Sequence, residues 1–288
     1  MAAINEVPFL KGHGTGNDFV VIPDLDGVRG LSADQVRFLC DRHTGIGANG
    51  VLRVVRTQHV PDSVPGSGAA EFFMDYRNAD GSLAEMCGNG ARVFVRYLKA
   101  AGLVTGSEVT IGTRGGVVNA SMHEDESITI DMGRADPVGV GEGLTVSAGG
   151  RTWAATGVHI PNPHAVVFVE SLEEAGDLLR APLVAPQEVF PDGVNVEFVT
   201  RIGPDHVAMR VHERGVGETL SCGTGACAVA WVARRNTGAG TTGELPTSTM
   251  RVDVPGGSLR ITETAEGNLL LNGPADLVAR GTVLLPTN

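Results

Sequence analysis

Two stretches of the chain repeat one pattern: a cysteine, then Gly-x-Gly-Ala, then apolar residues at helical spacing. The stretches begin at Cys87 and Cys222. The apolar residues at i, i+3, i+4 and i+7 are Ala91, Phe94, Val95 and Leu98 in the first stretch, and Ala226, Val229, Ala230 and Ala233 in the second. Each pattern predicts a helix that begins at a tight turn beside the cysteine. Unpaired N–H groups and the helix dipole at such a start favour a thiolate.

The rest of the chain mainly predicts short strands. Apolar runs predict them at about 7–10, 19–22, 51–56, 70–77, 108–111, 116–122 and 127–132, and then at 165–169, 194–199, 207–213 and 276–284. Ser32 and Gln35 form a capping box for a helix that should run to about Arg42. Gly102 should end the first cysteine helix. Turns or loops are expected at 12–18, 45–50 and 58–68.

Three landmarks recur in one order, which indicates an internal duplication. Besides the cysteine turn, a second capping box begins at Ser171, and an asparagine precedes a strand at both Asn17 and Asn162. We expect an α/β (α+β) fold of two pseudo-symmetric domains, each a mostly antiparallel β-sheet or barrel wrapped around a central helix. The N-terminal half should span 1–128, completed by 277–288, and the C-terminal half 129–276. If a pseudo-twofold axis relates them, both helix starts can face one cleft.

Composition narrows the class of protein. With 288 residues and 42% hydrophobic content, the chain can form one large globular domain or two of ordinary size. The net charge of −11 argues against nucleic acid or an anionic membrane as a partner, because both attract clustered Lys and Arg. No apolar run approaches the roughly 20 residues of a membrane span, and the N-terminus does not resemble a signal peptide. We expect a cytoplasmic protein that acts on a small-molecule substrate.

The four cysteines show no C-x-x-C pair and no zinc-ligand spacing, so no metal site is expected. Cys40, on the apolar face of the first capped helix, and Cys227, one turn into the second cysteine helix, should be core residues. Cys87 and Cys222 allow three interpretations. They can be structural turn residues, the redox pair of a thiol oxidoreductase, or the acid and base of a proton transfer at carbon.

Two-base proton transfer accounts best for a duplicated cysteine turn. Inverting a stereocentre needs a base on one face and an acid on the other, and a thiolate and a thiol exchange these roles when the reaction runs backward. The α-proton of an amino acid is only weakly acidic, so the site must also stabilise negative charge on the carboxylate. Backbone N–H groups at Gly88, Asn89, Gly223 and Thr224 would do so.

Several segments resemble the diaminopimelate epimerase family. They are Met86–Arg92, His212–Thr219, Ser221–Ala226, Asn17–Phe19, Asn78–Gly81, Asn162–His164 and Gly193–Val196. The Glu-Arg-Gly-x-Gly-Glu-Thr segment is specific to that family, and the resemblance runs from about residue 9 to 281. It implies interconversion of LL- and meso-diaminopimelate, on the route to lysine and peptidoglycan. It also implies a homodimer that uses no cofactor, including pyridoxal phosphate.

The resemblance also implies a role for each matching residue. Cys222 would accept the proton in the LL-to-meso direction and Cys87 would donate one. The substrate-binding residues would be Asn17, Asn78, Gly88, Asn89, Asn162, Asn195, Glu213, Arg214, Gly223 and Thr224. Glu213 can accept from the substrate ammonium and Arg214 can clamp a carboxylate. His164 and Glu213 would tune the cysteines.

Two other enzyme families are related to the diaminopimelate epimerases, and this sequence differs from the diaminopimelate epimerase pattern at two places. Proline racemases also pair two cysteines but typically read Cys-Gly-His-Gly, where this chain has Asn89, and phenazine-biosynthesis isomerases share the fold without the cysteine pair. Many family members carry Asp-Gln or Asp-Gly where this chain has Asn49-Gly50, so a glutamine contact to substrate cannot be transferred. Pro161 replaces a glycine before Asn162 and stiffens that turn.

Overall fold

A computed structural model describes residues 5–68, 70–236 and 247–286. The chain divides into two compact units, and we describe each by itself. Unit 1 comprises Met1–Ile130 and Pro274–Asn288, and unit 2 comprises Asp131–Gly273. Residues 1–4 lie outside the described residues, and they make up most of the N-terminal segment that does not resemble a signal peptide. The last two residues of the expected 277–288 segment lie outside them as well.

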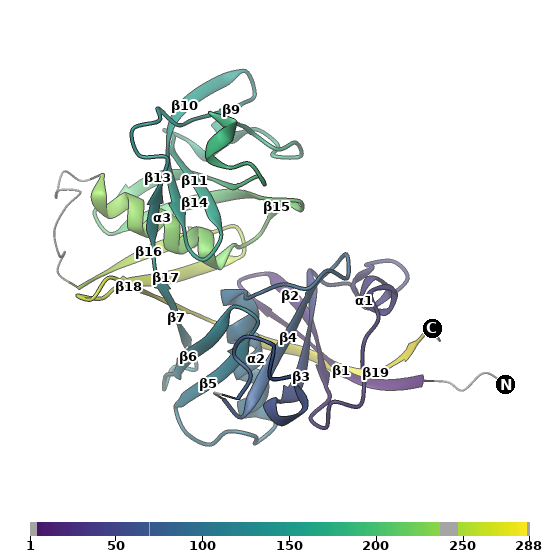
Figure 1. Ribbon diagram of the computed structural model, residues 1–288. Coiled ribbons are helices and arrows are strands. Elements are labelled where there is room, and N and C mark those ends of the chain that lie inside the picture. The colour runs from purple at the N-terminus through teal and green to yellow at the C-terminus, as the bar shows by residue number, and fades with distance from the viewer. Residues whose placement is uncertain (1–4, 69, 237–246, 287–288) are drawn as a thin grey trace. The chain divides into compact units, whose positions relative to one another are not determined.

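The described part of unit 1 combines a β-sheet with helices (Figure 1). Its strands are β1 (Asn5–Gly14), β2 (Asn17–Pro23), β3 (Gly50–Arg56), β4 (Phe72–Asn78), β5 (Glu108–Thr113), β6 (Gly116–Met122), β7 (Ile128–Arg134) and β19 (Asp276–Leu285). Its helices are α1 (Ala33–Cys40), α2 (Gly88–Ala100) and the 3₁₀ turn η1 (Thr57–His59). Strand β19 pairs along β1, so the end of the chain completes this unit's sheet. The pairs β2–β3 and β4–β5 are parallel, and β19–β1, β1–β2, β3–β4, β5–β6 and β6–β7 are antiparallel.

Unit 2 repeats this order of pairing. Its strands are β8 (Asp136–Val138), β9 (Thr145–Ala148), β10 (Arg151–His159), β11 (Pro163–Phe168), β12 (Leu183–Ala185), β13 (Asn195–Gly203), β14 (His206–Glu213), β15 (Gly217–Thr219), β16 (Ser248–Val254), β17 (Gly257–Glu263) and β18 (Asn268–Gly273). Its helices are α3 (Gly223–Arg235) and the 3₁₀ turns η2 (Leu172–Ala175) and η3 (Gln187–Val189). Here β11–β13 and β14–β16 are parallel, matching β2–β3 and β4–β5, while β13–β14 is antiparallel like β3–β4. The predicted fold class, a mostly antiparallel α+β fold with a central helix in each half, is confirmed.

Each cysteine helix forms the centre of its unit. Helix α2 contacts β1, β2, β3, β4 and β19, and α3 contacts β10, β11, β13, β14, β16, β17 and β18. The predicted apolar positions on both helices are all buried, among them Phe94 and Val229. Burying a large apolar side chain contributes about 1.5–3 kcal/mol, so this face fixes the helix against the sheet. Gly102, at φ +68°, follows the end of α2 as expected. Within the described parts of the chain, no helix is long and apolar enough to cross a membrane.

Helix α1 forms as its capping box predicts. Ser32 accepts from the Gln35 backbone N–H, and the Gln35 side chain accepts from the Ser32 N–H. The helix ends at Cys40, two residues before the predicted end, because Asp41 is already extended. Cys40 packs in the core between α1 and the sheet, and burial raises the pKa of its thiol to about 12. Cys227 is also fully buried. Both cysteines are core residues, as predicted.

The pattern was wrong where pairing between distant segments decides the structure. Segment 12–18 is not one long turn, because β1 continues to Gly14 by pairing with both β19 and β2, and β2 already begins at Asn17. The capping box at Ser171 forms, but it opens only the 3₁₀ turn η2, since Gly176 stops the helix at φ +71°. The pattern also missed strands β8, β9, β10, β12, β15, β16, β17 and β18.

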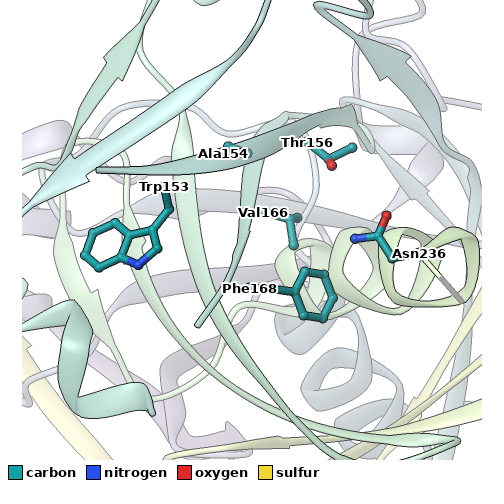
Figure 2. A pocket seen from close by; sticks show the side chains of 7 residues that line it. Trp153, Ala154, Thr156, Val166, Phe168 and Asn236 are labelled. Atoms are coloured by element: carbon teal, nitrogen blue, oxygen red, sulfur yellow. The ribbon is translucent and has the colours of Figure 1, made fainter. Parts of the chain in front are cut away.

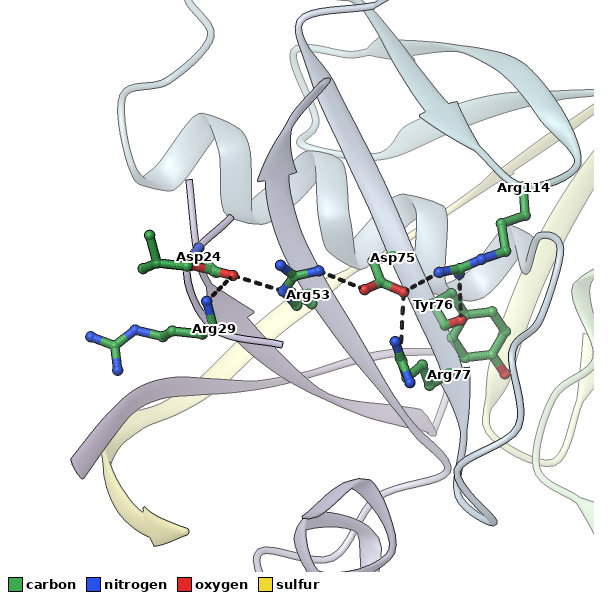
Figure 3. Close-up of polar contacts among 8 residues, drawn as sticks. Asp24, Arg29, Arg53, Asp75, Tyr76, Arg77 and Arg114 are labelled. Carbon is green, nitrogen blue, oxygen red and sulfur yellow. Dashed lines mark hydrogen bonds and ion pairs between the residues drawn. The ribbon is translucent and has the colours of Figure 1, made fainter. Parts of the chain in front are cut away.

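A chain of buried ion pairs ties β2, β3 and β4 together in unit 1 (Figure 3). Arg53 contacts Asp24 at 2.7 Å and its cross-strand partner Asp75 at 2.9 Å. Arg114 contacts Asp75 at 2.5 Å, and Arg77 lies 3.5 Å from it. Burial by itself raises the pKa of Asp75, but the hydrogen bonds and charges of these arginines outweigh it and the pKa is lowered.

Candidate active site

Cys87 stands at the N-cap of α2. Its backbone is extended, with φ −144° and ψ 121°, and its sulfur accepts the Gly90 N–H at 3.4 Å. The first N–H groups of a helix have no acceptor inside the helix, and at this helix start the sulfur of Cys87 satisfies that of Gly90. The predicted turn geometry around this cysteine is confirmed.

A network of amide side chains surrounds Cys87. The Asn17 Oδ1 atom accepts from the Cys87 thiol at 3.8 Å and from the Asn89 side-chain amide at 3.1 Å. Asn17 in turn donates to Asn49 Oδ1 at 3.1 Å. Beneath them the fully buried Arg92 donates to Asn89 Oδ1 at 2.9 Å. Sequence reasoning missed Arg92, although a cation one turn into an apolar helix face was a visible signal.

Asn78 lies at the end of β4, directly opposite Gly50 on β3. Its side chain donates to Ser82 Oγ at 3.0 Å, within its own turn. The register places Asn78 beside the Asn49-Gly50 segment, at the same edge of the sheet. Of the predicted unit 1 residues, Asn17 and Asn89 therefore lie beside Cys87, while Asn78 lies at the end of β4, across from Gly50.

Cys222 occupies the matching N-cap of α3. Its sulfur accepts the Gly225 N–H at 3.4 Å and lies 3.4 Å from Thr224 Oγ1. A Cβ atom added to Gly225 would lie 2.6 Å from Glu197 Oε1 and 3.3 Å from the Cys222 sulfur. Only a glycine fits there, because the carboxylate and the sulfur both approach the first turn of the helix.

Two carboxylates make the surroundings of Cys222 acidic. Burial raises the pKa of the Cys222 thiol well above its usual value, and the charges of Glu213 and Glu197 raise it further. Hydrogen bonds from Thr224 and Gly225 lower it by less. In the substrate-free protein, burial and these two carboxylates therefore oppose the thiolate that a helix start favours.

Glu213, at the end of β14, keeps part of its surface exposed, yet protein atoms enclose its carboxylate. Burial raises its pKa, and the charge of Glu197 adds to that, while a hydrogen bond from Thr219 and the charge of His164 lower it. Arg214, the next residue, is exposed, and its guanidinium donates to the Asp192 carbonyl at 3.2 Å.

His164 is fully buried between an acid and an amide. Its Nδ1 atom lies 2.6 Å from Glu197 Oε1, and its Nε2 atom lies 2.8 Å from Asn162 Oδ1. The second oxygen of Glu197 is buried and has no hydrogen-bond partner among the described residues. Sequence reasoning missed Glu197, although a lone charge inside the strand 194–199 was the signal that could have revealed it.

Asn195 connects the remaining predicted residues of unit 2. Its Oδ1 atom accepts from the Arg214 backbone N–H at 2.9 Å, and its amide donates to the Pro163 carbonyl at 3.2 Å. Unit 2 thus brings together Asn162, His164, Asn195, Glu213, Arg214, Gly223 and Thr224 around Cys222 and the start of α3.

A separate cavity of 340 Å³ lies at the other end of α3 (Figure 2). Trp153, Ala154, Ala155, Thr156, Val166, Phe168 and Asn236 line it. None of these side chains is ionisable and none was a predicted site residue. The acid–base groups of unit 2 gather at the Cys222 end of the helix instead.

The chain matches the family model described as diaminopimelate epimerase over residues 9–138 and 156–278. A diaminopimelate epimerase of Streptomyces coelicolor is 52% identical over 276 residues, covering 96% of this chain and 94% of that protein. One of Corynebacterium glutamicum is 45% identical over 285 residues, covering 96% of this chain and 98% of that protein.

Solved structures share the fold at low sequence identity. A phenazine biosynthesis protein of the PhzF family from Bacillus anthracis superposes with a TM-score of 0.69 at 16% identity, covering 98% of this chain and all of that one. A hydroxyproline epimerase from Agrobacterium vitis superposes with a TM-score of 0.65 at 17% identity, covering 98% and 94%.

Proposed function

Because this chain belongs to the diaminopimelate epimerase family, we propose that it interconverts LL- and meso-diaminopimelate by proton transfer between the substrate α-carbon and two cysteines, one on each face. In the LL-to-meso direction, Cys222 as thiolate removes the proton from the α-carbon. Cys87 as thiol then delivers a different proton to the opposite face. The reaction is an isomerisation that needs no cofactor, and it supplies precursors of lysine and peptidoglycan.

One observation carries this proposal: both cysteines are N-caps of corresponding helices in two units with the same strand pairing. Each sulfur lies 3.4 Å from an N–H of its own helix start. In the carbanion-like transition state, negative charge builds on the substrate carboxylate, where the N–H groups of Gly88, Asn89, Gly223 and Thr224 stabilise it.

The acidic surroundings of Cys222 suit its role as the base. A thiol whose pKa is raised forms a more basic thiolate, which helps remove a weakly acidic α-proton. The ammonium of bound substrate, held by Glu213, brings a positive charge close to that thiolate. Substrate thereby offsets part of the penalty that burial and two carboxylates impose on the ionised sulfur.

The remaining roles follow from the family. Asn17, Asn78, Asn162 and Asn195 bind the amino-acid groups of the substrate, together with Asn89. Arg214 clamps a carboxylate, and His164 and Glu213 tune the cysteines. The protein acts as a homodimer in the cytoplasm.

Solvent labelling tests the proposal. With LL-diaminopimelate in D₂O, early meso product should carry deuterium at the inverted carbon while remaining LL substrate stays nearly unlabelled. The proton on a buried thiol is mostly returned before it exchanges with solvent. Cys87→Ala and Cys222→Ala should each lose most of the epimerase rate, since a relay fails when either end is missing. The core variant Cys227→Ala is the matched control and should keep it.

Unlabelled early product, or near-normal turnover of Cys87→Ala, would exclude the two-base assignment. Racemisation of L-proline without action on diaminopimelate would instead identify a proline racemase. A Cys87–Cys222 disulfide that forms and is reduced reversibly, with no epimerisation of either substrate, would identify a thiol redox protein.

A further inference from the structure

The two units place one pair of side chains in corresponding positions beneath each cysteine turn. In unit 1 the parallel ladder starts with Phe19 opposite Gly50, and in unit 2 it starts with His164 opposite Asn195. Two residues further along the second strand come Leu52 and Glu197. A Cβ atom on Gly90 of α2 would contact Leu52 and Phe19, as one on Gly225 of α3 would contact Glu197.

The chemistry of this pair differs between the units. Unit 1 fills the place with the apolar side chains of Phe19 and Leu52, both fully buried. Unit 2 fills it with His164 and Glu197, which are equally buried. An apolar pair therefore suffices for this fold, and burying an acid and an imidazole without a role would only cost free energy.

Both ring nitrogens of His164 face oxygen atoms. A carboxylate oxygen faces Nδ1 and an amide oxygen faces Nε2. Because both neighbouring atoms are oxygens, a proton on each ring nitrogen would satisfy both contacts. The other titratable groups that face this pair are Glu213 of β14 and Cys222 of α3.

The same two contacts orient Asn162. In unit 1, Asn17 Oδ1 accepts from the Asn89 amide. The residue at the matching place in α3 is Thr224, whose hydroxyl lies beside the Cys222 sulfur instead. In unit 2 the Nε2–H of His164 takes over, and it leaves the amide N–H groups of Asn162 free for another acceptor.

We propose that Glu197 is a positioning residue: it fixes the Nε2–H of His164 on Asn162 Oδ1 and so aims the Asn162 amide at the substrate. The role of Asn162 as a substrate contact rests on the proposed function. The proton arrangement of His164 does not, because it is a property of the protein alone.

The first test reads the ring nitrogens of His164 by ¹⁵N NMR in the substrate-free protein at pH 7. In the wild type both should be protonated. In Glu197→Gln the amide can donate to Nδ1, so only Nε2 should carry a proton. An unprotonated Nε2 in the wild type would overturn the proposal, whatever reaction the protein catalyses.

The second test measures steady-state kinetics. Glu197→Leu introduces the residue that unit 1 has at the matching position, Leu52, and removes the carboxylate that fixes the tautomer of His164. The variant should raise KM for diaminopimelate about tenfold, which is the effect of one misplaced hydrogen bond. Glu197→Gln should stay within about threefold of the wild type, because it preserves the Nε2–H. An unchanged KM in Glu197→Leu, or equal losses in both variants, would overturn the proposal.

Glu263→Gln is the matched control. Glu263 is another buried carboxylate of unit 2, paired with Arg234 and Arg235 near the end of α3. This variant should lose stability yet leave the KM and the His164 nitrogen shifts unchanged. If Glu263→Gln reproduced the effects of Glu197→Leu, the changes in KM and in the His164 ¹⁵N chemical shifts would reflect destabilisation of unit 2 as a whole. That result would exclude the positioning role of Glu197.

Discussion

Asn49 Oδ1 accepts two hydrogen bonds at 3.1 Å, one from the side-chain amide of Asn17 and one from the backbone N–H of Asp18. Asn49 lies in the segment 45–50, which the sequence predicted as a turn. Its side chain serves to hold another asparagine rather than only to form a turn. The candidate substrate contact Asn17 is therefore oriented from both sides, by Asn49 and by Asn89.

Asn49→Ala should lower kcat/KM for diaminopimelate about tenfold, because Asn17 loses one of its orienting hydrogen bonds. The thermal unfolding midpoint should change little. Asn119→Ala is the matched control, since Asn119 is an exposed asparagine of the same unit, bonded only to Thr110 in the described contacts. Equal activity in Asn49→Ala and Asn119→Ala would show that Asn17 needs no such support.

Glu213→Gln should make the protein more stable and less active. The raised pKa means that the folded state holds the Glu213 proton more tightly than the unfolded state does, so stability falls as pH rises above about 4.3, the usual value of a glutamate. A neutral isostere removes this loss. The variant should therefore exceed the wild type in urea denaturation at pH 7 but not below about pH 4.

The same variant should lower kcat/KM about 10- to 100-fold, since a charged hydrogen bond to the substrate ammonium is lost. Glu218→Gln, which changes an exposed glutamate paired with Arg210, is its control and should alter neither property much. A Glu213→Gln protein that unfolds more easily than the wild type at pH 7 would contradict the assignment.

Asp75→Asn should destabilise unit 1 by about 3 kcal/mol, because it leaves the partly buried Arg53, Arg77 and Arg114 without their shared, buried carboxylate. The pKa of Asp75 is lowered in the folded state. Its contribution is therefore complete above the unfolded-state value of about 3.9 and is lost as pH falls through the lower folded value. Urea denaturation between pH 7 and pH 3 should show the gap between wild type and variant narrowing in acid.

Asp34→Asn provides the control for that experiment. Asp34 also pairs with an arginine, Arg37, but its side chain is 87% exposed. Exposed pairs contribute about 0–1 kcal/mol, so this variant should track the wild type at every pH. If the difference in free energy of unfolding between the wild type and Asp75→Asn increased in acid, the result would contradict a carboxylate that stabilises the folded state as its anion.

Epimerisation should continue at full rate after treatment with aminooxyacetate and dialysis, because thiols and helix starts supply the acid–base groups and the charge stabilisation. The measurement is the rate of meso product formation, alongside a visible spectrum of the purified protein. An absorbance band of bound pyridoxal phosphate, with activity lost on its removal, would refute the prediction.

Local signals in the sequence predicted the parts of the fold that depend on neighbouring residues. Ser32 and Gln35 cap α1 through their own side chains, and the Cys-Gly-x-Gly-Ala stretches open α2 and α3 where expected. Strand pairing is a different case. Strand β1 continues to Gly14 because it pairs with β19 on one side and with β2 on the other. No local pattern contains that information.

The candidate site divides in the same way. The sequence predicts the turns that carry the asparagines. It does not indicate a role for Glu197, which is a single charge within an apolar strand. Its importance depends on His164, which lies on the adjacent strand β11. The raised pKa of Cys222 could not be predicted either, because it arises first from burial and then from the carboxylates of Glu213 and Glu197 on β14 and β13.

The contact between Gly225 and Glu197 constrains how the two copies of this fold could diverge. At Gly90 the nearest atom to an added Cβ is the tip of Leu52, 3.3 Å away, so a small side chain would need only a slight shift there. At Gly225 the same change meets a carboxylate oxygen at 2.6 Å. A descendant of this protein could gain a side chain at position 225 only after losing the acid at 197. Evolutionary drift at these two positions should therefore be coupled in unit 2, while Gly90 and Leu52 in unit 1 can change independently.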